Sequence, residues 1–298
     1  MTTAAAEASG HRAVVVEENA ATKILRTLGK APVYLFLIAV GLLWLVPTFG
    51  LFITSLLPAQ LTQEKGWWQF FSEPSVVTLD NYRLVFETKA FTDALLTTVW
   101  VSVGATVGTV LVAALAGYAF AWLEFPGRDW LFIFVIALLV VPLQMALIPM
   151  FSLYDRVGIF DTILSLVLFH IAFGLPFAIF LLRNFFIGIP KDILESARID
   201  GASELRIFLR LILPLGLPAI ASLAIFQFLW VWNDLIVALT FGRDTQPITV
   251  AIFSQLREFS NTIELIAPAS FISLAIPLAV FFAFQRYFVQ GLLAGSVK

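Results

Sequence analysis

The charged residues of this chain are gathered into short segments that separate long apolar runs. Six runs contain no Asp, Glu, Lys or Arg, and they cover residues 31–63, 94–123, 130–154, 162–182, 211–233 and 265–285. About 20 apolar residues are enough for an α-helix to cross the hydrocarbon core of a membrane. Each run is continuously apolar and does not alternate with a period of two, so helices are favoured over strands. The pattern predicts an all-α, polytopic membrane protein with six transmembrane helices.

Composition supports the same class and argues against others. Apolar residues make up 60% of the chain and charged residues 13%, whereas soluble domains have roughly 45–50% and 25%. The net charge is −2 and no basic arm is present, so a nucleic-acid partner is not expected. Cysteine is absent, and His11 and His170 are the only histidines, which argues against disulfides and against a metal site.

The polar segments between the runs define the domain organisation. Residues 1–30 are rich in Ala, Glu and Thr, and we expect a mobile tail there. Residues 31–298 are expected to form a single transmembrane domain. Within it we expect additional structure at 58–93 on the outer face, a polar insert at 184–214, and a C-terminal tail at 286–298.

The distribution of Lys and Arg predicts the orientation in the membrane. An even number of spans places both termini on one side, and that side collects twelve of the 18 Lys and Arg residues. Positively charged residues concentrate in cytoplasmic loops, so both termini and the 184–214 insert are predicted to be cytosolic. Trp122 and Trp130 flank a short turn and are expected to lie at the membrane interface.

The first half of the insert has the signals of a short helix. Pro190 suits a first helical turn, and Asp192 and Glu195 favour the positive start of a helix. Asp200 and Gly201 suit its end, because glycine tolerates a positive φ.

A second short helix is expected to begin near Ser203, so that the insert forms a bent helical pair. We expect the apolar side chains of this helical pair to lie on one face and the charged side chains on the other. The apolar members are Ile193, Leu194, Ala197, Leu205, Ile207, Phe208 and Leu209, and the charged members, expected in solvent, are Lys191, Glu195, Arg198, Glu204, Arg206 and Arg210. Pro214 and Pro218 should bend the entry to the fifth span.

The insert resembles a motif of a known family. Permeases of binding-protein-dependent ABC importers carry an EAA loop, with the pattern Glu-Ala-Ala, three residues, Gly, nine residues, and Ile-x-Leu-Pro. The matching residues of this chain are Glu195, Ala197, Gly201, Leu213 and Pro214, while Ser196 replaces the first Ala and Leu211 replaces Ile. Both replacements are small or conserve volume, so the resemblance is retained.

The resemblance extends from about Leu79 to the C-terminus and is greatest to the maltose-type subfamily, which imports carbohydrates. The segments that carry it are Asp80-Asn81-Tyr82-Arg83, Gly117-Tyr118-Ala119-Phe120-Ala121, residues 142–149, Ile199-Asp200-Gly201-Ala202 and Trp232-Asn233-Asp234. The ending at residues 285–298 resembles the smaller of the two permease subunits. That ending and Gly66-Trp67-Trp68 resemble the α-glucoside branch.

This resemblance implies a type I ABC importer permease fold in a bacterial plasma membrane. It implies as partners a second, dissimilar permease subunit, two ATPase subunits that bind ATP and magnesium, an extracytoplasmic sugar-binding protein, and a carbohydrate substrate. The chain itself is then a non-catalytic subunit without a cofactor. In agreement, its only Gly-Lys pair, Gly29-Lys30, is followed by Ala31, so the chain has no phosphate-binding loop.

The residues that the resemblance assigns to coupling with the ATPases are Glu195, Ser196, Ala197, Asp200, Gly201 and Pro214. Closure of the ATPases would move the insert, and the spans would rearrange between inward and outward access. Local explanations stay open for two of these residues. A carboxylate such as Glu195 also stabilises a helix start, and Gly201 is also a suitable helix stop.

The polar and aromatic candidates for a substrate path are Gln144, His170, Gln227, Trp230, Asn233 and Asp234. Amides and carboxylates hydrogen-bond sugar hydroxyls, and an indole ring can stack on a sugar face. Structural alternatives stay open. His170, Gln144 and Gln227 can make interhelical hydrogen bonds, and Asn233-Asp234 can cap a helix or contact the partner permease, which can itself carry the main sugar contacts.

Other features of the spans have structural interpretations. Gly104 and Gly108 form a small-x3-small pattern that predicts close helix packing. Four prolines inside the apolar runs are expected to break helices around a transport pathway or to bend them for packing alone; they are Pro142, Pro149, Pro176 and Pro277.

Two other classes of function compete with the ABC permease. A self-sufficient ion-coupled transporter usually places ionisable residues in the middle of the bilayer, but the six runs contain no Asp, Glu, Lys or Arg. A membrane enzyme should show convergent acid, base or metal-binding groups, and no such cluster is visible in the sequence.

Overall fold

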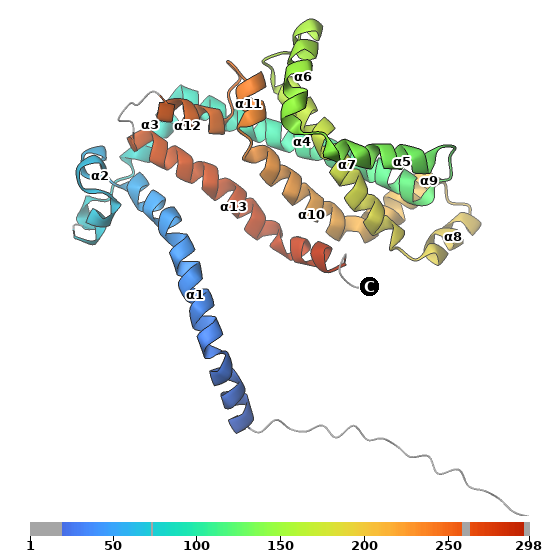
Figure 1. The fold of residues 1–298 in the computed structure, drawn as a ribbon, viewed down its shortest axis with the longest axis horizontal. Helices are drawn as coiled ribbons and strands as arrows, with labels where there is room; N and C mark the ends of the chain where they lie inside the picture. The colour runs from blue at the N-terminus through green and yellow to red at the C-terminus, as the bar shows by residue number, and fades with distance from the viewer. Residues whose placement is uncertain (1–19, 73, 258–262, 295–298) are drawn as a thin grey trace, which may run out of the picture. The chain divides into compact units, whose positions relative to one another are not determined.

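The computed structural model describes residues 20–72, 74–257 and 263–294, and most of these residues are helical (Figure 1). No β-strand occurs in the described part of the chain, in agreement with the predicted all-α class. The chain divides into two compact units, Met1–Gly50 and Leu51–Lys298. Residues 31–50 of the predicted transmembrane domain therefore fall in the first unit.

Helix α1 forms the described part of the first unit. It begins at Ala20, inside the predicted N-terminal tail, and ends at Leu56 in the second unit. Its segment Ala31–Leu56 has 26 residues and is apolar and long enough to cross a membrane. Residues 1–19 of the predicted tail lie outside the described residues.

Four long helices form the body of the second unit. They are α4 (Lys89–Trp122), α7 (Ile163–Ile187), α10 (Leu213–Trp232) and α13 (Ile263–Ala294). Helix α4 packs along α7 and α10, and α10 packs against α13 (Figure 1). The predicted C-terminal tail is a continuation of α13 up to Ala294, and residues 295–298 lie outside the described residues.

Small residues explain the close approach of α4 and α7. A Cβ atom on Gly104 would lie 3.2 Å from the side chain of Val167, and one on Gly108 would press against Ile171. Further along, a Cβ atom on Gly117 would lie 3.1 Å from the backbone nitrogen of Arg183. The packing prediction for Gly104 and Gly108 is therefore confirmed.

The third apolar run, which we counted as one span, is broken at a proline that we expected to break or bend a helix. It forms α5 (Arg128–Ala137), the 3₁₀ turn η3 (Leu138–Val140) and α6 (Leu143–Val157), and the two halves are bent by 101°. The break lies at Pro142, which has no backbone N–H and forces Val141 into an extended conformation with ψ of 115°. Within the described residues, five helices are long and apolar enough to span a membrane, and there are six spans if the bent pair counts as one.

The segment between α1 and α4 is folded around the end of α1. It contains α2 (Ala59–Lys65), two 3₁₀ turns, η1 (Trp67–Phe71) and η2 (Pro74–Val76), and α3 (Asp80–Glu87). The amide of Asn81 donates hydrogen bonds to the carbonyl oxygens of Ser55 and Leu57, at 3.1 and 2.8 Å. The hydroxyls of Tyr82 and Ser55 lie 2.6 Å apart. Asn81 thus supplies donors to carbonyl oxygens at the end of α1, where the helix itself has no further N–H groups to offer.

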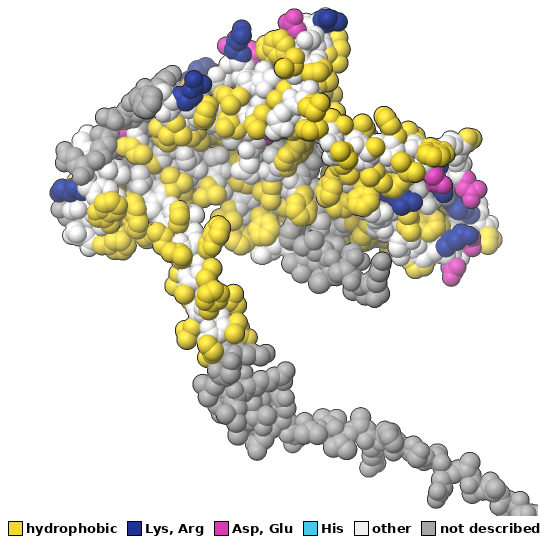
Figure 2. All heavy atoms as spheres, in the orientation of Figure 1, with side chains coloured by type: hydrophobic (Ala, Val, Ile, Leu, Met, Phe, Trp, Pro, Cys, Tyr) yellow, Lys and Arg dark blue, Asp and Glu magenta, His cyan; other side chains and the backbone are white. Residues whose placement is uncertain are grey.

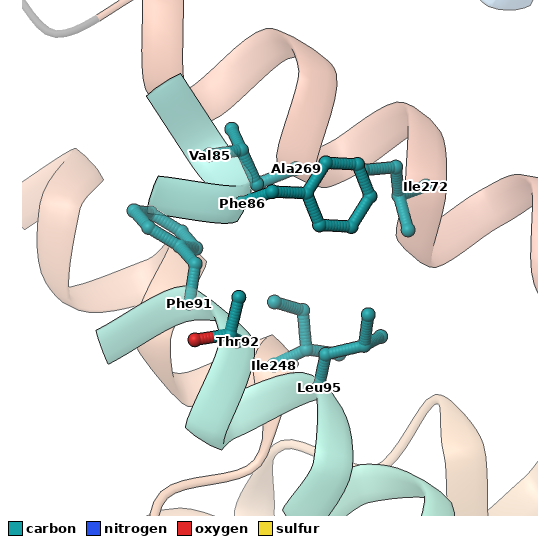
Figure 3. A pocket seen from close by; sticks show the side chains of 8 residues that line it. All are labelled: Val85, Phe86, Phe91, Thr92, Leu95, Ile248, Ala269 and Ile272. Atoms are coloured by element: carbon teal, nitrogen blue, oxygen red, sulfur yellow. The ribbon is translucent and has the colours of Figure 1, made fainter. Parts of the chain in front are cut away.

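Two short helices, α11 (Ile236–Phe241) and α12 (Ile248–Arg257), follow α10. The backbone N–H of Ile248 donates to Oγ1 of Thr98 on α4, at 2.7 Å. Nearby, side chains of α3, α4, α12 and α13 converge on an apolar cavity of about 10 Å³ that includes Val85, Phe91 and Ala269 (Figure 3). It has room for at most one water and offers that water almost no polar partners, so it is a packing gap rather than a ligand site.

The second arm of the insert also differs from our prediction. Helix α9 (Glu204–Ile207) passes through a π-helical turn, η4 (Phe208–Ile212), directly into α10, and Glu204–Trp232 forms one span of 29 residues. The N–H of Leu213 donates to the carbonyl oxygen of Phe208, five residues back. A π turn is wider than an α turn, and it lies directly before Pro214, whose ring cannot fit against the carbonyl of a regular preceding turn. A local π turn thus lies at the entry to the fifth span, directly before the two prolines.

Candidate functional site

The first arm of the insert is a separate helix, α8 (Lys191–Ile199), held by one buried side chain. Pro190 precedes it, with ψ of 129°, and Asp192 lies in its first turn, as the sequence indicated. Leu194 is fully buried in an apolar cluster that includes Leu182, Phe186 and Ile207, and Ala197, one turn later, packs against the same cluster. This face attaches α8 to the body of the unit.

Helix α8 ends in a Schellman motif. Gly201 has a φ of +78°, its N–H donates to the carbonyl oxygen of Arg198, and the N–H of Ala202 donates to the carbonyl oxygen of Ala197, each at 3.0 Å. Only glycine adopts this φ without strain. A Cβ atom on Gly201 would meet no atom within 4 Å, so the space around it is open. The helix stop predicted at Asp200-Gly201 is confirmed.

The opposite face of α8 is exposed and carries both charge and apolar surface. Ile199 is 86% exposed, although it is a large aliphatic residue. Nζ of Lys191 lies 2.7 Å from Oε1 of Glu195, and this hydrogen bond lowers the pKa of the Glu195 carboxyl below its usual value. The Ser196 hydroxyl donates to the Asp192 carbonyl oxygen at 2.7 Å. Figure 2 shows the charged side chains gathered around α8 and α9, next to a hydrophobic flank.

The structure thus brings five of the six predicted coupling residues together. Glu195, Ser196 and Ala197 lie on α8, and Asp200 and Gly201 form its end. Pro214 lies instead within α10, after the π turn.

Two charged residues of the insert form an ion pair that the sequence did not predict. Nε of Arg198 lies 2.9 Å from Oε1 of Glu204, and Nη2 of Arg198 lies 3.3 Å from Oε2. The hydroxyl of Tyr118, on α4, donates to the same Oε2 atom. Nη2 of Arg198 also donates to the carbonyl oxygen of Trp122, at 3.4 Å. We predicted Arg198 and Glu204 to be solvated, but they connect α8, α9 and α4.

Trp122, which we predicted to lie at the membrane interface, makes a hydrogen bond between two helices. Its indole Nε1–H donates to the carbonyl oxygen of Phe186, at 3.0 Å, so the ends of α4 and α7 are linked. Trp130, in contrast, is 79% exposed, as expected of a residue that meets the membrane interface.

A groove lies on α7 and α10 and is the second candidate site. It encloses about 260 Å³ and is lined by Phe173, Gly174, Phe177, Leu223, Phe226, Gln227 and Trp230. Four of the seven are aromatic, one supplies an amide, and none is charged. Largely apolar walls with one placed polar group are typical of a site for a small uncharged molecule. Gln227 and Trp230 were sequence candidates, whereas Phe173, Phe177 and Phe226 were not distinguishable from ordinary apolar residues of a span.

His170 lies beside this groove but does not line it. Its side chain is buried, its ring meets that of Trp230 edge to face at a centroid distance of 5.1 Å, and its carbonyl oxygen accepts from Nε2 of Gln227 at 3.3 Å. Its Nε2 atom lies 3.7 Å from Oδ2 of Asp234, beyond hydrogen-bond distance. It lines an enclosed space of about 10 Å³ with Ser102 and Asp234.

Asn233 and Asp234 make local contacts that agree with a helix-capping role, the alternative to contact with a substrate. The Asn233 amide donates to the carbonyl oxygen of Leu229, at 2.8 Å. The Asp234 carboxylate accepts from the N–H groups of Val237 and Ala238, at 3.4 and 3.0 Å, and so caps α11.

Gln144 is exposed in the first turn of α6 and does not line the groove. Of the six substrate-path candidates, the structure therefore places Gln227 and Trp230 in one groove and His170 beside it. Within the described residues, no three His, Asp or Glu side chains are grouped in a way that could hold a metal ion.

Comparison with known proteins identifies one matching family. The family described as "Binding-protein-dependent transport system inner membrane component" matches residues 109–293. This range contains α8, α9 and both helices of the groove.

Two relatives and one solved structure are similar over most of the chain. The osmoprotective compounds uptake permease protein of Synechocystis sp. is 46% identical over 90% of this chain and 92% of its own length. The alpha-glucoside transport system permease protein of Rhizobium meliloti is 49% identical over 76% of this chain and 61% of its own length. The crystal structure of a bacterial ABC transporter that imports the acidic polysaccharide alginate contains a chain with the same fold. Its TM-score is 0.69 at 21% identity, with 91% of this chain and 99% of that chain covered.

Proposed function

The chain belongs to the family of inner membrane components of binding-protein-dependent transport systems, and from this premise we propose that it is one permease subunit of an ATP-driven carbohydrate importer. It is a multi-pass membrane protein, and the part of the chain that the structure describes contains five or six apolar spans. Its partners in this proposal are a second, dissimilar permease, two ATPase subunits and an extracytoplasmic sugar-binding protein.

The observation that carries the proposal is the exposed apolar surface of α8. Ile199 is 86% exposed on a helix that Leu194 anchors to the body. Burying an isoleucine side chain stabilises an association by about 1.5–3 kcal/mol, so Ile199 is suited to a groove on a soluble partner. Glu195 and Asp200 supply charges around it, and the partner is an ATPase subunit.

The energy for transport comes from the ATPase subunits and not from this chain. The chain has no phosphate-binding loop in its sequence, and among the described residues no three His, Asp or Glu side chains are grouped to hold a metal ion. Its role is to convert movement of α8 into alternating access of the spans, as a non-catalytic subunit.

The groove on α7 and α10 is the part of the substrate path that this subunit supplies. Phe173, Phe177 and Trp230 offer aromatic faces, and Gln227 offers an amide to sugar hydroxyls. Because no charged side chain lines the groove, the substrate is a neutral di- or oligosaccharide, and an α-glucoside fits the similarity to the alpha-glucoside permease.

Reconstitution tests the proposal. The chain is coexpressed with its partner permease and ATPase subunits, and the purified assembly is placed in vesicles with the binding protein. We expect ATP-dependent uptake of a labelled neutral glucoside, and ATPase subunits retained in detergent. Uptake by the purified chain alone, driven by an ion gradient, would contradict the proposal.

A pair of substitutions tests the docking surface within the same assay. Ile199→Asp places a charge at the centre of the exposed face of α8 and should release the ATPase subunits. Val157→Asp is the matched control, because Val157 is also exposed, at 57%, but lies at the end of α6. Equal retention of the ATPases by both variants would argue against docking through α8.

A further inference from the structure

The side chains of three helices meet at the carboxylate of Glu204, close to the proposed ATPase-docking surface. Arg198 on α8 binds both carboxylate oxygens, and the Tyr118 hydroxyl on α4 donates to Oε2. Glu204 itself begins the span that continues as α10. The guanidinium reaches further, to the carbonyl oxygen of Trp122 at the end of α4.

We propose that Tyr118, Glu204 and Arg198 form a clasp that makes α8, α4 and α10 move as one body when the ATPases move α8. The clasp rests on the proposed function, because it acts only if α8 receives force from a partner. Its three members are positioning residues and contact neither sugar nor ATP.

The attachment of α8 shows why such a clasp is needed. The helix has nine residues, and Leu194 is its only buried residue. The Asp200–Ser203 turn that links it to α9 is open around Gly201. Leu194 and the partly buried Ala197 lie on one face, and a short helix held only along one face can tilt while the spans stay in place. The Arg198–Glu204 pair adds a second point of attachment across this turn, so a displacement of α8 carries α9 with it.

Tyr118 extends the connection to α4. Its side chain is buried, with 4% exposed, and its ring packs against that of Phe208 at a centroid distance of 5.4 Å. From Tyr118, α4 continues without a break to Thr98, which accepts the N–H of Ile248 on α12. At a rise of 1.5 Å per residue, Thr98 and Tyr118 lie about 30 Å apart along the helix. Helix α4 therefore joins the clasp to the segment that follows α10, at the other end of the helix bundle.

The clasp restricts the relative orientation of the helices more than it stabilises the fold. Arg198 and Glu204 are 34% and 44% exposed, and ion pairs at such positions contribute little to folding. Two parallel hydrogen bonds from a planar guanidinium nevertheless restrict the relative orientation of the two helices, which an ammonium group cannot do. Substitutions should therefore alter how closely transport follows ATP hydrolysis more than they alter assembly.

The test measures the amount of sugar transported per ATP hydrolysed, normalised to the assembled complex in vesicles. Tyr118→Phe removes one hydroxyl and should lower this ratio about threefold to tenfold, the range that corresponds to one lost hydrogen bond. Arg198→Ala should lower it as well, and Arg198→Lys should restore little of the loss, because an ammonium group cannot make the two parallel hydrogen bonds. Tyr154→Phe is the matched control, because Tyr154 is equally buried at 4% but lies on α6.

A combined variant separates a clasp from independent effects. If Tyr118 and Arg198 act through the same carboxylate, the ratio for Tyr118→Phe combined with Arg198→Ala should be close to that of the worse single variant. An unchanged ratio for Tyr118→Phe, or an equal loss for Tyr154→Phe, would overturn the clasp while the importer function stands. Absence of ATP-driven uptake by the unmodified assembly would overturn the proposed function and the clasp with it.

Discussion

Gly174 of α7 and Gln227 of α10 approach each other so closely that no side chain fits between them. A Cβ atom on Gly174 would lie 2.6 Å from Oε1 of Gln227 and 2.7 Å from its Nε2. Both residues line the groove, and Gln227 is its only side-chain amide. The absence of a side chain at residue 174 therefore sets the position of the one polar group that the groove offers to a substrate.

Gly174→Ala should weaken sugar transport by displacing the Gln227 amide. We expect the sugar concentration for half-maximal uptake to rise about tenfold, which corresponds to the loss of one hydrogen bond to the substrate. Gly41→Ala is the control, because a Cβ there meets no atom within 4 Å. An unchanged concentration dependence in Gly174→Ala would argue that Gln227 does not contact the sugar.

Gly201→Ala should reduce sugar-stimulated ATP hydrolysis by straining the end of α8. A φ of +78° costs an alanine about 1–2 kcal/mol, so the Schellman motif loosens and α8 loses its fixed orientation. Gly201→Asn should be milder, because asparagine tolerates this conformation. Gly127→Ala carries the same strain at a φ of +80°, also in open space, but lies before α5. Stimulation that falls equally in Gly127→Ala would contradict a specific role of the α8 end.

Asp234→Ala should destabilise α11, because two backbone N–H groups lose their acceptor. Loss of such a cap costs about 1 kcal/mol. Hydrogen–deuterium exchange of residues 236–241 should therefore become faster by about fivefold. Asn233→Ala serves as comparison, since its amide bonds only to a carbonyl within its own helix. Faster exchange in both variants would show that the effect is not one of capping.

Asn81→Ala should lower the thermal stability of the chain. The Asn81 side chain is 7% exposed, and its removal leaves the carbonyl oxygens of Ser55 and Leu57 without this donor. A loss of about 1–3 kcal/mol is expected for such buried polar groups. The midpoint of thermal unfolding in detergent gives the measurement. Asn81→Asp, which cannot donate, should be at least as destabilised, and a wild-type midpoint in either variant would refute the interpretation.

The predicted orientation can be measured with single cysteines, because the chain has none of its own. Ser196→Cys on α8 should react with a membrane-impermeant maleimide only after cells are opened. Ser72→Cys, in the segment between α1 and α4, should react from outside. Both serines are exposed, so access depends on the side of the membrane. The reverse pattern would place α8 outside and exclude docking of a cytosolic ATPase.

Much of the architecture was predictable because burial in a membrane requires long apolar runs. The spans at α1, α4, α7, α10 and α13 match five of the six runs, since a helix satisfies its own backbone groups without reference to its neighbours. The end of α8 at Gly201 was also predictable from local sequence, because glycine tolerates the positive φ of a helix end. The break at Pro142 was visible as a proline, but its size depends on how the two halves pack, so the sequence did not distinguish a mild bend from one of 101°.

The sequence by itself determined the long apolar spans and the residue at which α8 ends, because these depend on neighbours within a few residues. The tertiary structure decided that Arg198 and Glu204 are paired, that Tyr118 joins them from 86 residues before Glu204, and that the groove is assembled from α7 and α10. This is because these contacts join helices that are distant in the sequence. From sequence alone, a charged residue in a polar insert is expected in solvent, and one phenylalanine of a span cannot be distinguished from another.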